Sequence, residues 1–425
     1  MPKLFEKIIC SKLNPYISKF VSHTQHGFMK GRSTETNLVV FMNFLLNSME
    51  QGDQVDSVYT DFSKAFDRVH HGLLLTKLCR LSFPLIFIKW LSSYLCGRLQ
   101  TVRINNSVSS DIKVYSGVPQ GSHLGPILFV LYVNDLCDVL TNYEYLFYAD
   151  DLKIFKRITS IDDTLVLQDN LLAIDLWCKK NYMELNVPKC KCITFSRKRN
   201  TNKLIYDYQI NAEKLIRCNI MNDLGVLIDE KVTMNDHVYN ITNKARRILG
   251  LVKRQAKGFN DPYVTKSLYC ALVRPILEYC CVVWMPYTKE LCNKIESVQK
   301  QFLLFALRNL NWNDPFVLPH YEDRLTLISM QTLQDRRTIL TSSFMYKLVN
   351  DEIDVNYLKQ KIVVNQSSYT TRNRNYLINC THSTDYGMNE PMTRMIRLYN
   401  SYYDCFVSSS SVNVFKCKIR SKLKV

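Results

Sequence analysis

The sequence predicts an α+β fold in which a sheet of short strands packs against helices, followed by a mainly helical second half. Up to about residue 230, helical patterns alternate with short runs rich in β-branched and aromatic residues. From about residue 235, long amphipathic patterns follow one another without strand signals. Only 12 Gly and 12 Pro occur in 425 residues, and this scarcity favours long helices.

Helices are predicted where apolar residues recur at helical spacing. The stretch 33–52 opens with N-capping residues and ends near Gly52. The stretch 160–186 has the same spacing, and Ser160 and Asp163 at its start have the spacing of a capping box. Further helical patterns cover residues 70–81, 84–97, the apolar part of 117–140, and the long segments 234–255, 261–284 and 289–307.

Strands are predicted in short runs bounded by turn residues. The run 55–62 is rich in Val and Tyr and ends with Asp61 and Phe62. The stretch 145–155 is predicted to form strand, two-residue turn and strand, with Asp150 and Asp151 at the tip. Further hairpins or strands are predicted around 105–107 and 211–214 and at 189–196 and 224–229, whereas the chain beyond 355 is polar and irregular.

The chain is basic, with 55 Lys and Arg against 38 Asp and Glu and a formal net charge of +17. This charge favours nucleic acid as a partner, although solvated lysine faces and acidic membranes are alternatives. No uncharged apolar run reaches the roughly 18 residues that span a bilayer, so we expect no membrane partner. The 15 cysteines are irregularly spaced and no secretory signal is found, which predicts an intracellular protein with reduced thiols.

Two adjacent carboxylates interrupt the apolar stretch "YLFYADDLKIF" at 145–155. Asp150 and Asp151 could simply form a turn, because Asp tolerates turn geometry. The flanking strands, however, are apolar enough to be buried, and neighbouring buried carboxylates are costly without a cation. If the strand that ends at Asp61 joins the same sheet, Asp61 and Asp150 meet at one edge. Such a set of oxygen ligands suits two Mg²⁺ ions about 3.5–4 Å apart.

Several sequence blocks, in the right order, resemble those of reverse transcriptases of non-LTR retrotransposons, specifically the Jockey-like group. The blocks similar to motifs A, B and C of that family are "YTDFSKAFDRV" (59–69), "SGVPQGSHLGPILFVLYVNDL" (116–136) and "YADD" (148–151). "QHGFMKGRST" (25–34) resembles the block before motif A, and 185–196 and 224–229 resemble motifs D and E. The segments 274–284 and 297–308 are similar to thumb helices, so the resemblance covers nearly the whole chain.

The resemblance implies a right-hand polymerase with an antiparallel palm sheet and packed helices, partial fingers and a helical thumb. Residues 1–52 would then form the partial fingers and 53–230 the palm with motifs A to E. Residues 231–355 would form the thumb, and 356–425 a C-terminal region that is basic at its end. The chain opens on a segment that resembles the middle of the family's fingers, so we expect a product that is truncated at the N-terminus.

The resemblance also implies catalytic and metal-binding roles. Asp61 and Asp150 would be the principal ligands of two Mg²⁺ ions, with Mn²⁺ as a possible substitute. The carbonyl of Phe62 would complete the metal coordination, and Asp151 would be the supporting carboxylate at the metal site. Lys189 matches a motif D lysine suggested to protonate the departing pyrophosphate; a solvated surface lysine is the alternative.

Further residues match positions near the nucleotide and template. Phe66 matches the position that blocks a nucleotide 2′-hydroxyl and so selects dNTPs, although an ordinary core position would also suit it. Arg32, with Lys30, could meet template or triphosphate oxygens, or could be solvated. The loop near the incoming nucleotide would contain Gly117, Pro119, Gln120 and Gly121; a plain tight turn would explain its Gly and Pro but not the whole string.

The sequence therefore predicts an RNA-directed DNA polymerase that binds an RNA template, a DNA primer, their hybrid and dNTPs. The alternative is a truncated, catalytically impaired relic that only binds RNA or RNA/DNA hybrid. A small-molecule hydrolase with paired carboxylates would not explain the motif order or the charge. RNA-dependent RNA polymerases also use an Asp-Asp hairpin, but Phe66 argues for dNTPs. The sequence carries no signal for an oligomeric state or for a choice between nucleus and cytoplasm.

Overall fold

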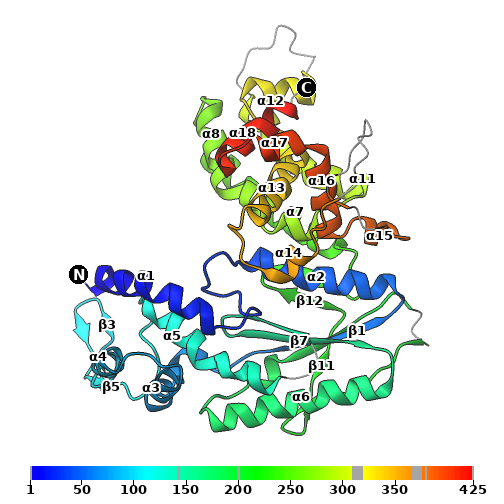
Figure 1. The fold of residues 1–425 in the computed structure, drawn as a ribbon. Coiled ribbons are helices and arrows are strands. Elements are labelled where there is room, and N and C mark those ends of the chain that lie inside the picture. Colours follow the sequence, from blue (N-terminus) through cyan, green and yellow to red (C-terminus); the bar gives the residue numbers. More distant parts are fainter. Residues whose placement is uncertain are drawn as a thin grey trace. The chain divides into compact units, whose positions relative to one another are not determined.

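The computed structural model describes residues 2–140, 144–198, 202–308, 319–365, 376–378 and 381–423. Figure 1 follows the chain through two compact units. The first unit comprises Met1–Asn37 and Gln51–Asn219, and the second comprises Leu38–Glu50 and Ile220–Val425.

The first unit is built on a five-stranded sheet with strand order β11-β8-β1-β7-β6. Neighbouring strands are antiparallel except for β11 and β8, which are parallel. The strands are β1 (Gln54–Thr60), β6 (Glu144–Tyr148), β7 (Asp151–Ile158), β8 (Lys191–Phe195) and β11 (Ile216–Arg217). Together with the helices described next, this sheet confirms the predicted α+β class.

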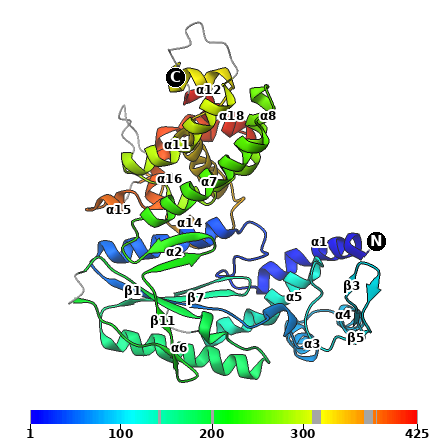
Figure 2. The ribbon, with the colours of Figure 1, turned by 180° about the vertical axis from the view of Figure 1, so that it is seen from behind.

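Five helices belong wholly to the first unit, and α6 runs along one face of its sheet (Figures 1 and 2). They are α1 (Pro2–Phe20), α3 (His71–Arg80), α4 (Leu85–Leu95), α5 (Leu124–Val133) and α6 (Ile161–Lys180). Short 3₁₀ turns are η1 (Ala65–Asp67), η2 (Asn134–Val139) and η3 (Val187–Lys189). A further helix, α2 (Thr34–Glu50), is shared, because its residues from Leu38 onward belong to the second unit.

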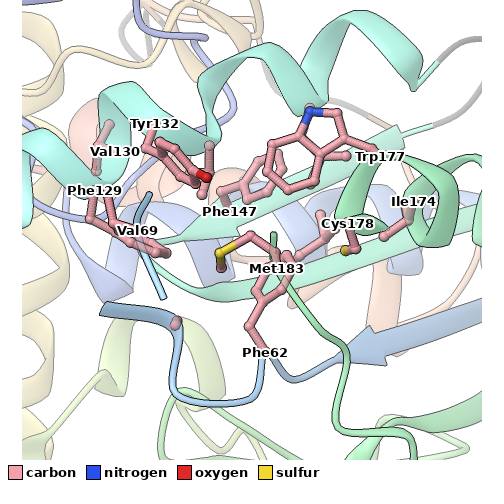
Figure 3. Close-up of a cluster of buried hydrophobic side chains, with 14 of the residues drawn as sticks. Phe62, Val69, Phe129, Val130, Tyr132, Phe147, Ile174, Trp177, Cys178 and Met183 are labelled. Carbon is pink, nitrogen blue, oxygen red and sulfur yellow. The ribbon is translucent and has the colours of Figure 1, made fainter. Parts of the chain in front are cut away.

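The core of the first unit gathers side chains from the sheet and from α5 and α6 (Figure 3). α5 has the sequence LGPILFVLYV and is apolar on all sides, a pattern that a helix can carry only when it is buried. Its Phe129 and Tyr132 share the cluster with Phe147 of β6 and Trp177 of α6. The hydroxyl of Tyr132 donates to the carbonyl of Asn181, which satisfies the one polar atom of this side chain.

Three small hairpins complete the first unit, two of them at predicted turns. Asn105 has φ +52° in the turn between β3 and β4, and Asn211 and Ala212 have φ +51° and +62° between β9 and β10. Positive φ at such positions is typical of tight hairpin turns. The strands are β2 (Leu99–Gln100) with β5 (Ile112–Lys113), β3 (Arg103–Ile104) with β4 (Ser107–Val108), and β9 (Gln209–Ile210) with β10 (Glu213–Lys214).

In its described residues the second unit is helical apart from the hairpin of β12 (Ile220–Asp223) and β13 (Val226–Asp229) and an isolated bridge between Val364 and Leu377. Its longer helices are α7 (Asn235–Gln255), α11 (Lys289–Ala306), α13 (Leu333–Val349), α16 (Pro391–Ser401) and α18 (Val412–Lys422). Its shorter helices are α8 (Pro262–Leu268), α9 (Arg274–Glu278), α10 (Cys281–Trp284), α12 (Tyr321–Leu327), α14 (Asn356–Gln360), α15 (Asp385–Met388) and α17 (Tyr403–Val407). Within the described ranges no helix is both long and apolar enough to cross a membrane, and the cysteines there are free thiols.

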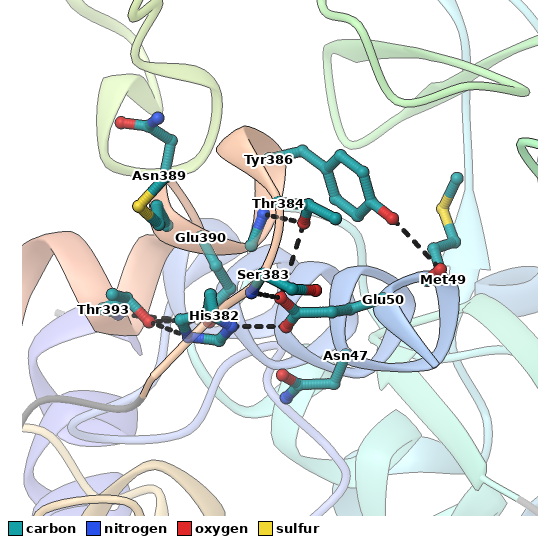
Figure 4. A network of polar contacts seen from close by, with 12 residues as sticks. Asn47, Met49, Glu50, His382, Ser383, Thr384, Tyr386, Asn389, Glu390 and Thr393 are labelled. Carbon is teal, nitrogen blue, oxygen red and sulfur yellow. Dashed lines mark hydrogen bonds and ion pairs between the residues drawn. The ribbon is translucent and has the colours of Figure 1, made fainter. Parts of the chain in front are cut away.

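A polar network ties the end of α2 to the start of α16 within the second unit (Figure 4). The carboxylate of Glu50 accepts a hydrogen bond from the backbone N–H of Ser383 (2.9 Å) and pairs with His382. The second ring nitrogen of His382 lies 2.8 Å from the hydroxyl of Thr393. Glu390 caps α16 by accepting from the backbone N–H of Thr393 (2.9 Å). Residues 50 and 382 to 393, far apart in the sequence, are therefore joined by charge and hydrogen bonds.

Three predicted elements differ from the structure. The single helix predicted over 261–284 is broken by a π turn at Tyr269–Val273, just before Pro275, and by Cys280 with φ +51°. Proline lacks the N–H that a regular helix needs, so the turn before it widens. The helix predicted over 160–186 ends at Lys180, and the stretch beyond 355, predicted to be irregular, contains the helices α14 to α18. Part of that polar stretch, 366–375, lies outside the described residues.

The buried face of α6 allows a direct test of how this helix packs. Leu171 is fully buried in the core, whereas its neighbour Leu172 is 49% exposed. We expect Leu171→Ala to lower the free energy of unfolding by about 2–5 kcal/mol, through lost burial and the cavity left behind. Leu172→Ala is the control and should change it by less than about 0.5 kcal/mol. Denaturant titrations of both variants would measure this, and equal effects would contradict the described packing.

Candidate active site

The pairing of β1 with β7 brings the predicted carboxylates to one end of the sheet. The register places Thr60 opposite Leu152, so that Asp61 directly follows the last paired residue of β1. β6 and β7 form a hairpin in which Tyr148 pairs with Asp151. The two turn residues are therefore Ala149 and Asp150, and Asp151 opens β7. The predicted hairpin is confirmed, with its tip one residue earlier than expected.

Asp61 and Asp150 interact electrostatically. Burial, and to a smaller extent the negative charge of Asp61, raise the pKa of the Asp150 carboxyl. The ammonium of Lys189 lies 3.5 Å from the Asp61 carboxylate, but its side chain is 68% exposed. An ion pair so open to water compensates little of the repulsion. The end of β1 thus holds two carboxylates whose mutual repulsion a bound cation would relieve.

A segment after α6 holds Asp61 from the other side. The backbone N–H of Asn186 donates to the carbonyl of Asp61 (2.8 Å), and that of Ser63 donates to the carbonyl of Glu184 (2.8 Å). Between them, Phe62 and Leu185 form an antiparallel bridge. The sequence pattern missed this contact, because it extended the helix to 186. The bridge explains how Lys189, only a few residues later, comes to lie beside Asp61.

Asp151 is the third predicted carboxylate. The side chain of Asp151 is exposed at the start of β7. Among the described residues no three His, Cys, Asp or Glu side chains are gathered so that they could hold a metal ion. The chemistry of Asp61 and Asp150 nevertheless fits a hard divalent cation, because both groups offer oxygen atoms and the lysine beside Asp61 is mostly exposed.

The Gly-rich loop before α5 is bound to the chain that follows β1. Gly117 has φ +85°, and a Cβ on it would lie 2.8 Å from the Cα and carbonyl oxygen of Asp67, so only glycine fits there. Its N–H donates to the carbonyl of Val69 (2.8 Å). The amide of Gln120 donates to the Asp67 carboxylate (2.9 Å). Pro119, which lies between Gly117 and Gln120 in the sequence, is half-buried.

Gly121 and Phe66 are the remaining predicted residues of this region. Gly121 has φ +79° and open space where a Cβ would be, so its backbone angle alone favours glycine. Phe66 packs against the core through a stacked contact with Phe129 (ring centroids 4.4 Å apart) but stays partly exposed. Its carbonyl accepts from the N–H of Val118 (3.0 Å). Phe66 is therefore a packed but only partly buried residue, which suits either of its predicted roles.

Two residues without an assigned role hold the carbonyl of Gly117. The Nε2 atom of His71 lies 2.8 Å from this oxygen, and Nη2 of Arg98 donates to it over 2.7 Å. Burial lowers the pKa of His71, which favours the neutral ring as donor. No sequence pattern singles out His71 or Arg98 for this role. Only the folded chain reveals that both support the loop.

Arg32 is engaged with the backbone of the segment that precedes it. Its Nη1 atom donates to the carbonyls of Ser22 and Gln25, both at 2.8 Å. Such bonds stabilise the conformation of residues 22–25. A contact of Arg32 with template or triphosphate stays a prediction.

The raised pKa of Asp150 predicts how the metal-free protein responds to pH. A carboxyl whose pKa is higher in the folded than in the unfolded state destabilises the fold as pH rises from its ordinary value of 3.8 through the raised value. We therefore expect Asp150→Asn to melt at a higher temperature than the parent at pH 7 in chelator. The difference should shrink to nothing below about pH 4. Asp169→Asn, on the exposed face of α6, is the control, and a less stable Asp150→Asn protein at pH 7 would contradict the assignment.

The chain is similar to known proteins over most of its length. The family described as reverse transcriptase (RNA-dependent DNA polymerase) matches residues 2–251. The chain is 26% identical over 367 residues to a probable RNA-directed DNA polymerase from transposon BS of Drosophila melanogaster, covering 82% of this chain and 39% of that protein. It is 29% identical over 315 residues to the RNA-directed DNA polymerase from mobile element jockey of Drosophila funebris, covering 71% of this chain and 34% of that protein.

The chain thus spans less than half the length of these relatives. Among solved structures, apo telomerase from Candida tropicalis aligns with a TM-score of 0.44 and 12% identity, over 83% of this chain and 54% of that one, a likeness too distant to support an argument. The family match covers more than half of the chain, and the relatives confirm the resemblance to Jockey-like elements. On these grounds the chain belongs to the reverse transcriptase family.

Proposed function

We propose that this chain is the RNA-directed DNA polymerase of a non-LTR retrotransposon. The observation that carries the proposal is the pairing of β1 with β7, which sets Asp61 and the partly buried Asp150 together at one end of the sheet. Membership of the reverse transcriptase family supports it, as do relatives named RNA-directed DNA polymerases. The chain would add dNTPs to the 3′-hydroxyl of a DNA primer on an RNA template.

The carboxylates would supply the metal site of this reaction. Asp61 and Asp150 would bind Mg²⁺, or Mn²⁺, with the Phe62 carbonyl, and Asp151 would support them once substrate draws the group together. Two bound ions supply an activated primer hydroxyl and charge compensation at the leaving oxygen. The partly buried position of Asp150 keeps water from weakening these interactions.

Lys189 would act on the leaving group. Its ammonium is 3.5 Å from the Asp61 carboxylate, within reach of any phosphate held at that residue. A protonated lysine there could donate its proton to the departing pyrophosphate, which is general-acid catalysis. Because the side chain is mostly exposed, it is free to move toward a bound triphosphate.

The loop of Gly117 to Gly121 and the ring of Phe66 would receive the nucleotide and template. Backbone without side chains allows close approach of a ligand, and both glycines have positive φ. The partly exposed ring of Phe66 would exclude a 2′-hydroxyl. Arg32 would contribute positive charge toward template or triphosphate oxygens.

The same proposal assigns the larger divisions of the chain to the parts of a right-hand polymerase. The sheet of the first unit would be the palm (53–230), preceded by partial fingers (1–52). The helices that follow would include the thumb (231–355), whose α7 is strongly basic; 356–425 would form a C-terminal region. Basic helix faces can track the phosphates of an RNA/DNA hybrid without reading its sequence. The basic residues of α7 include Lys244, Arg246, Arg247, Lys253 and Arg254.

One observation favours the second candidate, an impaired relic that binds RNA or hybrid without copying it. No group of three carboxylate, histidine or cysteine side chains within the described ranges is arranged to hold a metal. If substrate does not draw Asp151 toward Asp61 and Asp150, the metal site stays incomplete. Binding would then survive through the basic surface, because it needs no metal.

The polymerase proposal is tested by primer extension on an RNA template with Mg²⁺ and dNTPs. We expect the parent to extend the primer and Asp150→Asn to lose about 1,000-fold or more in rate, since bound metal supplies several kcal/mol of transition-state stabilisation. Asp169→Asn on α6 should keep the parent rate. Hybrid binding is measured in parallel by fluorescence anisotropy. Binding by every variant with extension by none would support the relic instead.

The proposed role of Phe66 predicts a change in sugar selection. Replacing Phe66 with Val removes the ring, so the ratio of dNTP to rNTP incorporation should fall by about 10-fold or more. Phe66→Tyr keeps the ring and should keep the selection. Single-nucleotide insertion kinetics with dCTP and CTP measure the ratio. An unchanged ratio in Phe66→Val would leave Phe66 as a core residue only.

A further inference from the structure

Residues 24–27 lie along the outer edge of β6, beside the turn that carries Asp150. The N–H of Phe147 donates to the carbonyl of Thr24 (3.0 Å), and the N–H of His26 donates to the carbonyl of Phe147 (2.9 Å). Gln25 and Phe147 form a parallel bridge. A loop that precedes β1 by about 30 residues therefore acts as an extra strand on the catalytic hairpin.

The side chain of Gln25 binds the turn itself. Its Oε1 atom accepts from the backbone N–H of Ala149 (3.0 Å) and from that of Gly27 (2.8 Å). Its Nε2 atom points to the carbonyl of Ala149 at 3.4 Å. Two donors at Oε1 fix which end of the amide is oxygen. Gln25 is only 3% exposed, so these bonds are shielded from water and costly to lose.

Ala149 needs such support because of its backbone. It has φ +58°, a left-handed conformation that a residue with a Cβ adopts at a cost of about 1–2 kcal/mol. Glycine would adopt it without that cost. Ala149 is also buried, so its N–H must find a partner within the protein. The amide of Gln25 supplies that partner and favours the strained angle over its alternatives.

The segment around Gln25 is itself fixed in place. A Cβ on Gly27 would lie 2.3 Å from the backbone nitrogen of Ala149, so the two backbones are in direct contact and residue 27 must be glycine. Arg32 donates to the carbonyl of Gln25 (2.8 Å). The buried ring of His26, whose pKa burial lowers to about 3, bonds to the hydroxyl of Thr36 (2.7 Å). Gln25 therefore reaches the turn from a rigid base.

We propose that Gln25 is a positioning residue, which holds the turn at Ala149 and thereby sets the Asp150 carboxylate in place for a divalent cation. The inference rests on the proposed function of Asp150 and adds a partner for it. Gln25 touches neither the reacting atoms nor the metal. It acts through the backbone of the residue next to the ligand, as partners of metal ligands commonly do.

The chain offers a matched control for this role. Gln54, also buried, lies at the opposite end of β1 and pairs with the peptide group of Leu204 in the same way: Nε2 donates to the carbonyl (2.7 Å) and Oε1 accepts from the N–H (3.0 Å). Gln54→Met and Gln25→Met each remove a buried amide of the same size that binds both the N–H and the carbonyl of one distant residue. Gln25 also binds the N–H of Gly27 (2.8 Å), and Gln54 also donates to the Asp56 carboxylate (2.9 Å). Both should lower stability, but only Gln25→Met removes a bond to the Asp150 turn.

The experiment uses the full chain without nucleic acid. Hydrogen exchange of the peptide containing Ala149 is followed by mass spectrometry, and Mn²⁺ affinity by electron paramagnetic resonance. We expect Gln25→Met to expose the Ala149 amide to exchange and to weaken Mn²⁺ binding by about 10-fold or more. Gln54→Met should leave both readouts near the parent. Adding Ala149→Gly to Gln25→Met should recover part of the Mn²⁺ affinity, because glycine adopts the turn without help.

The proposal is overturned if Gln25→Met leaves exchange at Ala149 unchanged, or if Gln54→Met weakens Mn²⁺ binding equally, which would indicate general destabilisation. Loss of Mn²⁺ affinity without recovery in the double variant would also overturn the argument from backbone strain. Primer extension by the parent is measured separately. A parent that binds Mn²⁺ through a Gln25-dependent turn but does not extend a primer would refute the polymerase and leave the positioning role standing.

Discussion

The antiparallel pairing of β1 with β7 is the constraint on which the rest of the site depends. A strand pair has one register, and a shift by a single residue would turn every side chain to the opposite face. In the observed register Asp61 continues β1 just where β7 begins, so two carboxylates share one end of the sheet. The loop of Gly117 and the segment of Asn186 are both bonded to the chain that leaves β1.

The electrostatics of this arrangement explain why the surroundings are so firmly bound. Two carboxylates near each other, one of them partly buried, favour any motion that separates them or admits water. Backbone hydrogen bonds oppose that motion at several points: Asn186 holds the carbonyl of Asp61, and Gln25 holds the peptide of Ala149. In the folded protein the two carboxylates therefore repel each other, and a bound divalent cation would attract both.

Much of the fold and of the candidate site could be predicted from the sequence, and the reason why a residue could or could not be predicted differs from one residue to the next. Asp61, Asp150 and Asp151 stood out because apolar strands flank them, and hairpins such as the one at Asn105 have local turn signals. Gln25 gave no signal of its role, because its partner Ala149 lies 124 positions away. The bond between Asn186 and Asp61 was missed because helical spacing continued past Lys180. A contact between residues far apart in the sequence, unlike the periodicity of a helix or strand, produces no recognisable pattern in a single sequence.

The segment of residues 24–27 has a second consequence, for solubility. β6 carries the aromatic run "YLFY" and is the last strand on its side of the sheet, the kind of edge on which other chains can add strands and aggregate. The bonds from Thr24 and His26 occupy the polar groups of Phe147 that such a strand would need. At the far side the edge strand β11 has only two residues, too few to serve as a template. The loop beside the carboxylate turn therefore leaves these polar groups of Phe147 unavailable to a strand of another chain.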